Sequence, residues 1–165
     1  MWIARAAAVS AAVSSALLMS AIAEEYPLNS IFLRLRVGLP MAVTLVLLYE
    51  MHSRQWGLVG RAGFAAALLS TMAIVEPFAL TTAIGWWVLP LGLLMAGGDA
   101  VRKSLPRPAV FLLPLGAILL VRIPATLLAG EYVGGFAAMV AFGTAWLVLA
   151  SLLIFEEDTR RTERD

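Results

Sequence analysis

The sequence predicts an all-α integral membrane protein, a bundle of six transmembrane helices with both termini in the cytoplasm. Hydrophobic residues make up 61% of the 165 residues and charged residues only 14%, and the mean hydropathy is +0.89. Soluble domains carry about 45–50% apolar and about 25% charged residues. The apolar residues lie in long unbroken blocks, which is typical of membrane spans rather than of amphipathic core helices.

Six apolar segments follow one another, and each is close to the ~20 residues that cross about 30 Å of hydrocarbon as a helix. We expect them to form a single transmembrane domain over residues 1–155, because a chain of this length holds one domain. A charged cytoplasmic tail, residues 156–165, follows this domain. The expected spans cover about residues 2–23, 31–50, 58–75, 78–98, 109–130 and 133–155.

The first segment admits a second interpretation. Arg5, an apolar stretch and the small residues Ala21 and Ala23 before Glu24 also fit a cleaved signal peptide. The apolar stretch is longer than a typical signal core, which favours a span. Cleavage of residues 1–23 would leave five spans with the same orientation, so the topology is the same under both interpretations.

Several segment ends carry local signals. We expect the fourth segment to stop at Gly97 and Gly98, with Asp99 opening the next connection, because glycine favours helix C-termini. His52 follows the second segment and is expected in a solvated loop, although histidine there also suits a pH sensor. Acidic and basic residues spaced four apart in the tail predict that the last helix extends into water.

The basic residues set the predicted orientation. Nine of the twelve fall in the first segment, in or beside the second and fourth connections, or in the tail, and the positive-inside rule makes this side cytoplasmic. The other connections carry glutamate without lysine or arginine, so we expect them outside a cell membrane. The nine basic residues are Arg5, Arg54, Arg61, Arg102, Lys103, Arg107, Arg160, Arg161 and Arg164, and the outer acids are Glu24, Glu25, Glu76 and Glu131.

The remaining arginines, Arg34, Arg36 and Arg122, are placed by this topology in the outer half of the membrane. Arg122 lies eight residues before the outer end of its helix, roughly 12 Å deep. Arg34 and Arg36 point about 200° apart on a helix, so only one of them can face the bundle. A charge in hydrocarbon costs at least about 2.5 kcal/mol, so an inward arginine needs a partner.

Outer glutamates are the expected partners. Arg122 and Glu131 are about two and a half turns apart on one helix, so Glu76, between the third and fourth spans, is favoured. One interpretation is a structural clasp that ties three helices together. The alternative is an outward-facing cavity whose arginines hold an anionic group, with a glutamate as gate. The candidate residues are Arg36, Arg122, Glu76 and Glu131, with Trp86 and Trp87 as a candidate cavity wall.

Small residues recur every four positions in the first and last segments, which lets helix backbones approach closely. Packing within the chain explains this, and a docking face for a partner subunit is the alternative. Ala8, Ala12 and Ala16 form an alanine ladder on the first of six short helices. This arrangement is similar to the substrate-binding subunits of energy-coupling-factor transporters, in which such a ladder docks a partner, but no substrate motif accompanies it here. The expected face is Ala8, Ala12, Ala16 and Ser20, and the second ladder is Ala137, Ala141 and Ala145.

The chemistry-bearing residues predict no enzyme. The absence of cysteine and the presence of one histidine exclude disulfides, thiolate clusters and histidine-cluster zinc sites within the chain. The stretch MAGGDAVRK resembles the G-x-G-D motif of membrane aspartyl prepilin peptidases, but Ala96 replaces the first glycine and no second membrane aspartate exists. Basic residues are too dispersed to bind nucleic acid, and we expect no cofactor.

Two function classes remain. The small size, the few buried charges and the alanine ladders favour a structural or accessory subunit of a membrane complex. The alternative is a small-solute binding or transport protein that uses the outer arginine cavity.

Overall fold

The computed structural model describes residues 2–24, 31–75 and 79–162, and these contain helices and connections without any strand. The all-α class predicted from the sequence is therefore confirmed. The elements in chain order are α1 (Trp2–Glu24), α2 (Ile31–His52), α3 (Leu58–Val75), α4 (Ala79–Arg102), α5 (Arg107–Val110), α6 (Leu112–Ala129), a single π-helical turn η1 (Glu131–Gly135) and α7 (Phe136–Thr162).

Five stretches of the described helices are long and apolar enough to cross a membrane. The apolar part of α3, Leu58–Ile74, is shorter than these five. At 1.5 Å per residue, α3 reaches roughly 27 Å, just under the hydrocarbon thickness. Large apolar side chains such as Leu58, Leu69 and Leu128 lie exposed on the outside of the molecule. These apolar helices are compatible with a membrane protein.

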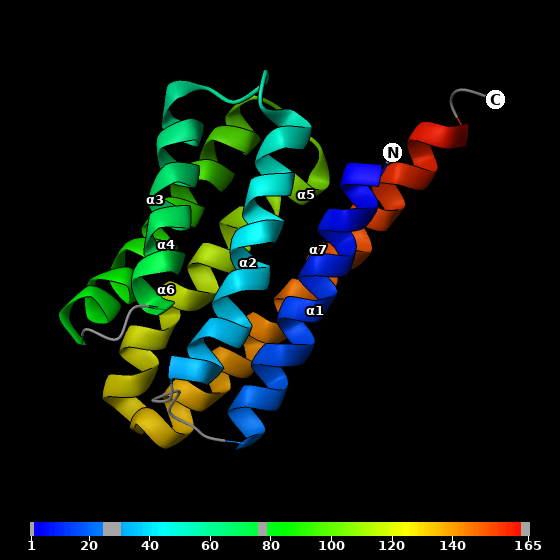
Figure 1. Ribbon diagram of the computed structural model, residues 1–165. Coiled ribbons are helices and arrows are strands. Elements are labelled where there is room, and N and C mark those ends of the chain that lie inside the picture. The colour runs from blue at the N-terminus through cyan, green and yellow to red at the C-terminus, as the bar shows by residue number, and fades with distance from the viewer. Residues whose placement is uncertain (1, 25–30, 76–78, 163–165) are drawn as a thin grey trace.

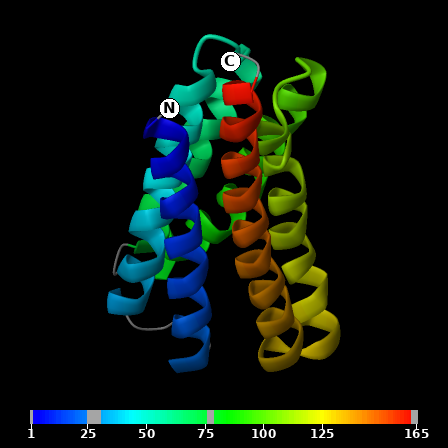
Figure 2. The same cartoon turned by 90° about the vertical axis from the view of Figure 1, so that its right-hand side faces the viewer.

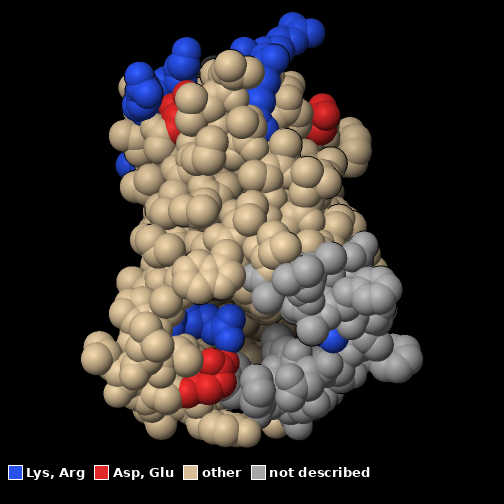
Figure 3. All heavy atoms as spheres, turned by 90° about the vertical axis from the view of Figure 1, so that its left-hand side faces the viewer, with Lys and Arg blue, Asp and Glu red and all other residues tan. Residues whose placement is uncertain are grey.

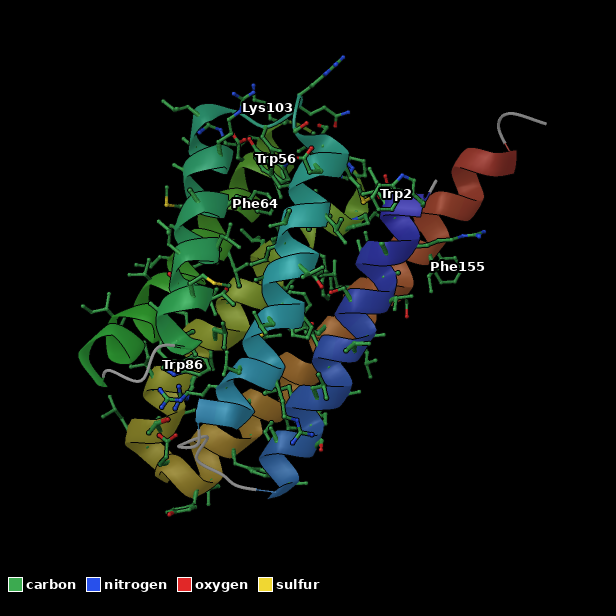
Figure 4. All side chains as sticks on the ribbon, in the orientation of Figure 1. Trp2, Trp56, Phe64, Trp86, Lys103 and Phe155 are labelled. Atoms are coloured by element: carbon green, nitrogen blue, oxygen red, sulfur yellow. The ribbon has the colours of Figure 1, made fainter. Side chains whose placement is uncertain are left out.

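The long helices alternate in direction and pack as two groups of three (Figures 1 and 2). α1 lies between α2 and α7, and α4 lies between α3 and α6. Contacts of α2 with α3 and of α6 with α7 join the two groups. Trp56 and Lys103 lie at one end of the molecule together with Trp2 and Phe155, whereas Trp86 lies toward the other end (Figure 4). We call the first of these the basic end, after its exposed Arg54, Arg61, Arg102, Lys103 and Arg107.

Glycine and alanine bring α3 and α4 into close contact. A Cβ on Gly92 of α4 would lie 2.6 Å from the Ala67 nitrogen and 2.7 Å from the Gly63 oxygen, both on α3. A Cβ on Gly63 would likewise lie 2.6 Å from the Ala96 nitrogen. Only a residue without a side chain fits these positions, so the small residues set the separation of the two helices.

The α1 helix packs against α2 and α7. The small residues that it buries there differ in part from the predicted ladder. Ala7 and Ala11 are fully buried, and the Ser15 hydroxyl donates a 2.7 Å hydrogen bond to the Gly143 carbonyl of α7. Of the predicted docking face, Ala8 is buried, Ala12 and Ser20 are half-buried, and Ala16 is exposed. Ala8 is therefore unavailable to a partner. In the second ladder Ala145 is buried, whereas Ala137 and Ala141 are exposed.

The predicted stop of the fourth segment at Gly97 and Gly98 is wrong, because α4 continues to Arg102. Gly97 serves a packing role instead, since a Cβ there would collide with the backbone of Leu113 on α6. Gly98 has open space around it. The last helix, α7, continues without a break to Thr162, so the start of the expected tail is helical.

Candidate functional site

The candidate site forms where α6 ends and the chain folds back on itself. Gly130 has φ +78°, a left-handed conformation that glycine adopts readily, and its N–H donates to the Thr126 carbonyl. The π turn η1 then packs against the end of α6, so closely that a Cβ on Gly134 would collide with the Ala125 carbonyl. Because the chain turns back at Gly130, Glu131, the first residue of η1, lies beside α6.

Arg122 is held by two partners from its own chain. Its Nη2 lies 2.7 Å from Oε1 of Glu131, and both side chains are partly exposed, at 24% and 33%. The guanidinium also lies 5.1 Å from the centre of the Trp86 ring on α4, within the range of a cation–π contact. The sequence-based preference for Glu76 over Glu131 overlooked this geometry, because it assumed one continuous helix.

A pocket of about 230 Å³ opens beside this ion pair. The Thr126 hydroxyl is buried at its margin and makes no hydrogen bond in the structure. Figure 3 shows acidic and basic atoms side by side in a hollow on one face, far from the basic atoms at the opposite end. The lining residues are Trp86, Trp87, Leu119, Arg122, Ile123, Thr126, Leu127 and Glu131.

Two predicted site residues remain, Arg36 and Glu76. Arg36 is exposed on α2 and is not among the lining residues. Its neighbour Arg34 is half-buried and donates a hydrogen bond of 3.5 Å to the Ile74 carbonyl near the end of α3. Arg34 therefore turns toward α3. Glu76 lies outside the described residues.

His52 and Glu156 form a polar contact that the sequence interpretation missed. His52 was expected in a solvated loop, but it is 1% exposed, and its Nε2 lies 3.5 Å from Glu156 Oε1 on α7. The prediction was wrong because His52 continues the buried face of α2, four residues after Leu48 and seven after Leu45. That helical spacing is the signal that would have placed it inside.

Asp99 forms a second buried polar contact. It is 6% exposed, and its Oδ2 accepts a 2.7 Å hydrogen bond from the Gly57 N–H at the start of α3. A Cβ on Gly60 would collide with the same carboxylate, so Asp99 lies over the first turn of α3. A carboxylate at this position accepts a hydrogen bond from a backbone N–H that has no acceptor within the helix, and its negative charge interacts favourably with the helix dipole.

Among the described residues, no group of three histidine, cysteine, aspartate or glutamate side chains could hold a metal ion. The described residues form an all-helical protein whose apolar helices are compatible with a membrane, and they include a partly exposed arginine–glutamate pair, Arg122 and Glu131. No protein-family model, curated protein or solved structure matches the chain.

Proposed function

We propose that the chain spans a cell membrane six times, with both termini and the basic end in the cytoplasm. The alternation of the helices brings the five exposed basic residues in or beside the connections to one end, and Trp86 lies toward the other (Figure 4). The positive-inside rule favours a cytoplasmic basic end. α3 is included because it packs between α2 and α4, and local thinning of the bilayer accommodates a helix a few ångströms short.

Within the membrane we propose a structural or accessory role rather than an enzymatic one. The observation that carries this proposal is that Arg122 has a carboxylate and an indole of its own chain as partners. Its charge then serves to hold α6, η1 and α4 together. Hydroxyl groups also connect the helices: the half-buried Ser10 of α1 donates a hydrogen bond of 2.8 Å to the Pro40 carbonyl of α2. Such internal ties suit a rigid scaffold.

The partner of this scaffold would dock on the outward face of α1. Ala16 and Ser20 lie on that face beside the exposed Val9 and Val13, whereas Ala12 packs partly against the core. The small side chains of Ala16 and Ser20 let a second helix approach closely there. Ala16→Phe fills this face without touching the core, and Ala141→Phe places the same side chain on an exposed position of α7 as a control.

The test is purification of each tagged variant from native membranes in mild detergent, followed by native electrophoresis and mass spectrometry. We expect the wild-type chain and Ala141→Phe to run with the same membrane partner, and Ala16→Phe to lose it. Migration of all three as the isolated chain would contradict the accessory role.

The pocket beside Arg122 supports a second candidate, binding of a small anion-bearing solute. Trp86 and Trp87 line the pocket, so binding should change tryptophan fluorescence on titration with small carboxylates or inorganic phosphate. Under this candidate, Arg122→Leu abolishes the fluorescence change and leaves thermal stability almost unchanged. Under the structural role, the same variant lowers thermal stability and the wild-type protein gives no saturable signal.

A further inference from the structure

A shallow apolar groove of about 240 Å³ runs between α2 and α3, on the outside of the bundle. Leu45 and Phe64 are buried and form its floor, and Val46 and Ala65 are exposed at its walls. The residues on α3 span two helical turns, roughly 10 Å along the helix axis. The full lining is Leu45, Val46, Tyr49, Arg61, Phe64, Ala65 and Leu68.

Contacts with two other aromatic rings fix the position of Phe64 in the floor of the groove. The ring centres of Tyr49 and Phe64 lie 5.4 Å apart in an edge-to-face contact, and the Trp56 ring makes a contact of the same kind with Phe64 at 4.7 Å. Edge-to-face contacts of this kind hold aromatic rings in fixed positions. The groove is therefore a formed feature of the α2–α3 surface.

The end of the groove nearest the connections is cationic. Arg61 is exposed in the first turn of α3, and its Nη2 donates a long hydrogen bond, 3.4 Å, to the Ser53 carbonyl. The exposed Arg54, Arg102 and Lys103 lie in or beside the connections at the same end of the molecule (Figure 4). The Asp99 carboxylate is buried and bound to the Gly57 N–H, so it does not face the groove. Glu50, one turn after Val46 on α2, is exposed and is the acidic residue beside the groove lining. Arg61, Arg54, Arg102 and Lys103 outnumber it, so the net charge at this end of the groove is positive.

We propose that this groove binds one anionic phospholipid. The phosphate binds Arg61, and the first part of an acyl chain lies over Phe64, between Val46 and Ala65. An apolar channel with a cation at one end matches a molecule with an anionic head and an apolar tail, and arginine pairs well with phosphate. The small side chain of Ala65 leaves the room that the acyl chain needs. The inference rests on the proposed membrane location.

The test uses the full-length protein purified in a neutral detergent, so that its outcome does not depend on orientation in a membrane. Native mass spectrometry follows retention of phosphatidylglycerol and of phosphatidylcholine with the same acyl chains. We expect selective retention of one phosphatidylglycerol, weakened about fivefold or more in Arg61→Gln, since one basic residue contributes that much near an anionic surface. Arg102→Gln removes an exposed charge outside the groove lining and serves as the matched control.

A second variant, Ala65→Phe, keeps every charge and fills the groove, so it should also lose the lipid while circular dichroism stays unchanged. Glycerol phosphate, which has no acyl chain, should not displace the lipid at equal concentration. Equal losses in Arg61→Gln and Arg102→Gln would overturn the proposal in favour of diffuse surface charge. Equal retention of the two lipids, or unchanged retention in Ala65→Phe, would overturn it as well, and none of these results would bear on the accessory role.

Discussion

The guanidinium of Arg122 and the carboxylate of Glu131 lie 2.7 Å apart across the break at Gly130, nine residues apart in sequence. We expect Arg122→Leu and Glu131→Gln each to lower the melting temperature in detergent. Since either substitution removes the same contact, the double variant should be little worse than the single ones. The coupling energy should be about 1 kcal/mol, as for polar contacts between membrane helices.

The measurement is a thermal unfolding series of the four proteins of this double-mutant cycle. Additive losses of stability would mean that the two side chains act separately, and the structural role proposed for the pair would then be wrong.

The carboxylate of Asp99 is expected to stabilise the start of α3. Asp99→Ala leaves the Gly57 N–H without its side-chain acceptor and should cost about 0.5–2 kcal/mol, the range for lost N-terminal caps. Asp99→Asn keeps an acceptor oxygen and should lose less. Thermal unfolding and hydrogen exchange of the α3 amides measure the effect, and unchanged exchange in Asp99→Ala would contradict it.

Because α3 packs closely on α4, substitutions of Gly92 and Gly98, both on α4, should change the stability of the protein differently. Gly92→Ala places a methyl group against the backbone of Ala67 and Gly63, and such overpacking costs about 1–3 kcal/mol. Gly98→Ala enters open space and should be neutral or stabilising, because alanine favours helices. Melting temperatures of the two variants check this, and equal values would show that the helices do not approach as closely as described.

The contact between His52 and Glu156 predicts that the two residues depend on each other. His52→Leu removes the ring nitrogen 3.5 Å from the largely buried Glu156 carboxylate, so we expect a loss of about 1–3 kcal/mol. Replacing both residues with leucine should recover most of this loss, since a buried polar pair is often replaceable by apolar side chains. A double variant less stable than His52→Leu would argue against the pairing.

The helical class and most helix positions could be predicted because the hydropathy of each apolar segment is averaged over many residues, so no single residue decides the prediction. The start of α3 at Leu58 and its end at Val75 agree with the predicted segment 58–75. The end of α4 could not be predicted, because glycine serves both as a helix terminus and as a close-packing residue. Contact with Leu113, far along the chain, decides between these roles at Gly97.

The candidate site was predictable only in part for a related reason. Trp86, Trp87, Arg122 and Glu131 were each identified from the sequence, and all four line the same pocket. Their pairing depends on the left-handed Gly130, a single backbone conformation that no periodicity reveals. The small residues of α1 were recognised as well, but their inward face includes Ala7 and Ala11 rather than only the predicted ladder.

Sidedness of the connections tests the central claim most directly, because the natural chain has no cysteine and single cysteines can be introduced freely. Lys103 is exposed at the basic end, and Tyr132 is 74% exposed in η1 beside the candidate site. In intact cells, a membrane-impermeant maleimide should label Tyr132→Cys and should label Lys103→Cys only after the cells are opened. Labelling of both positions from the same side of the membrane would contradict the proposed topology.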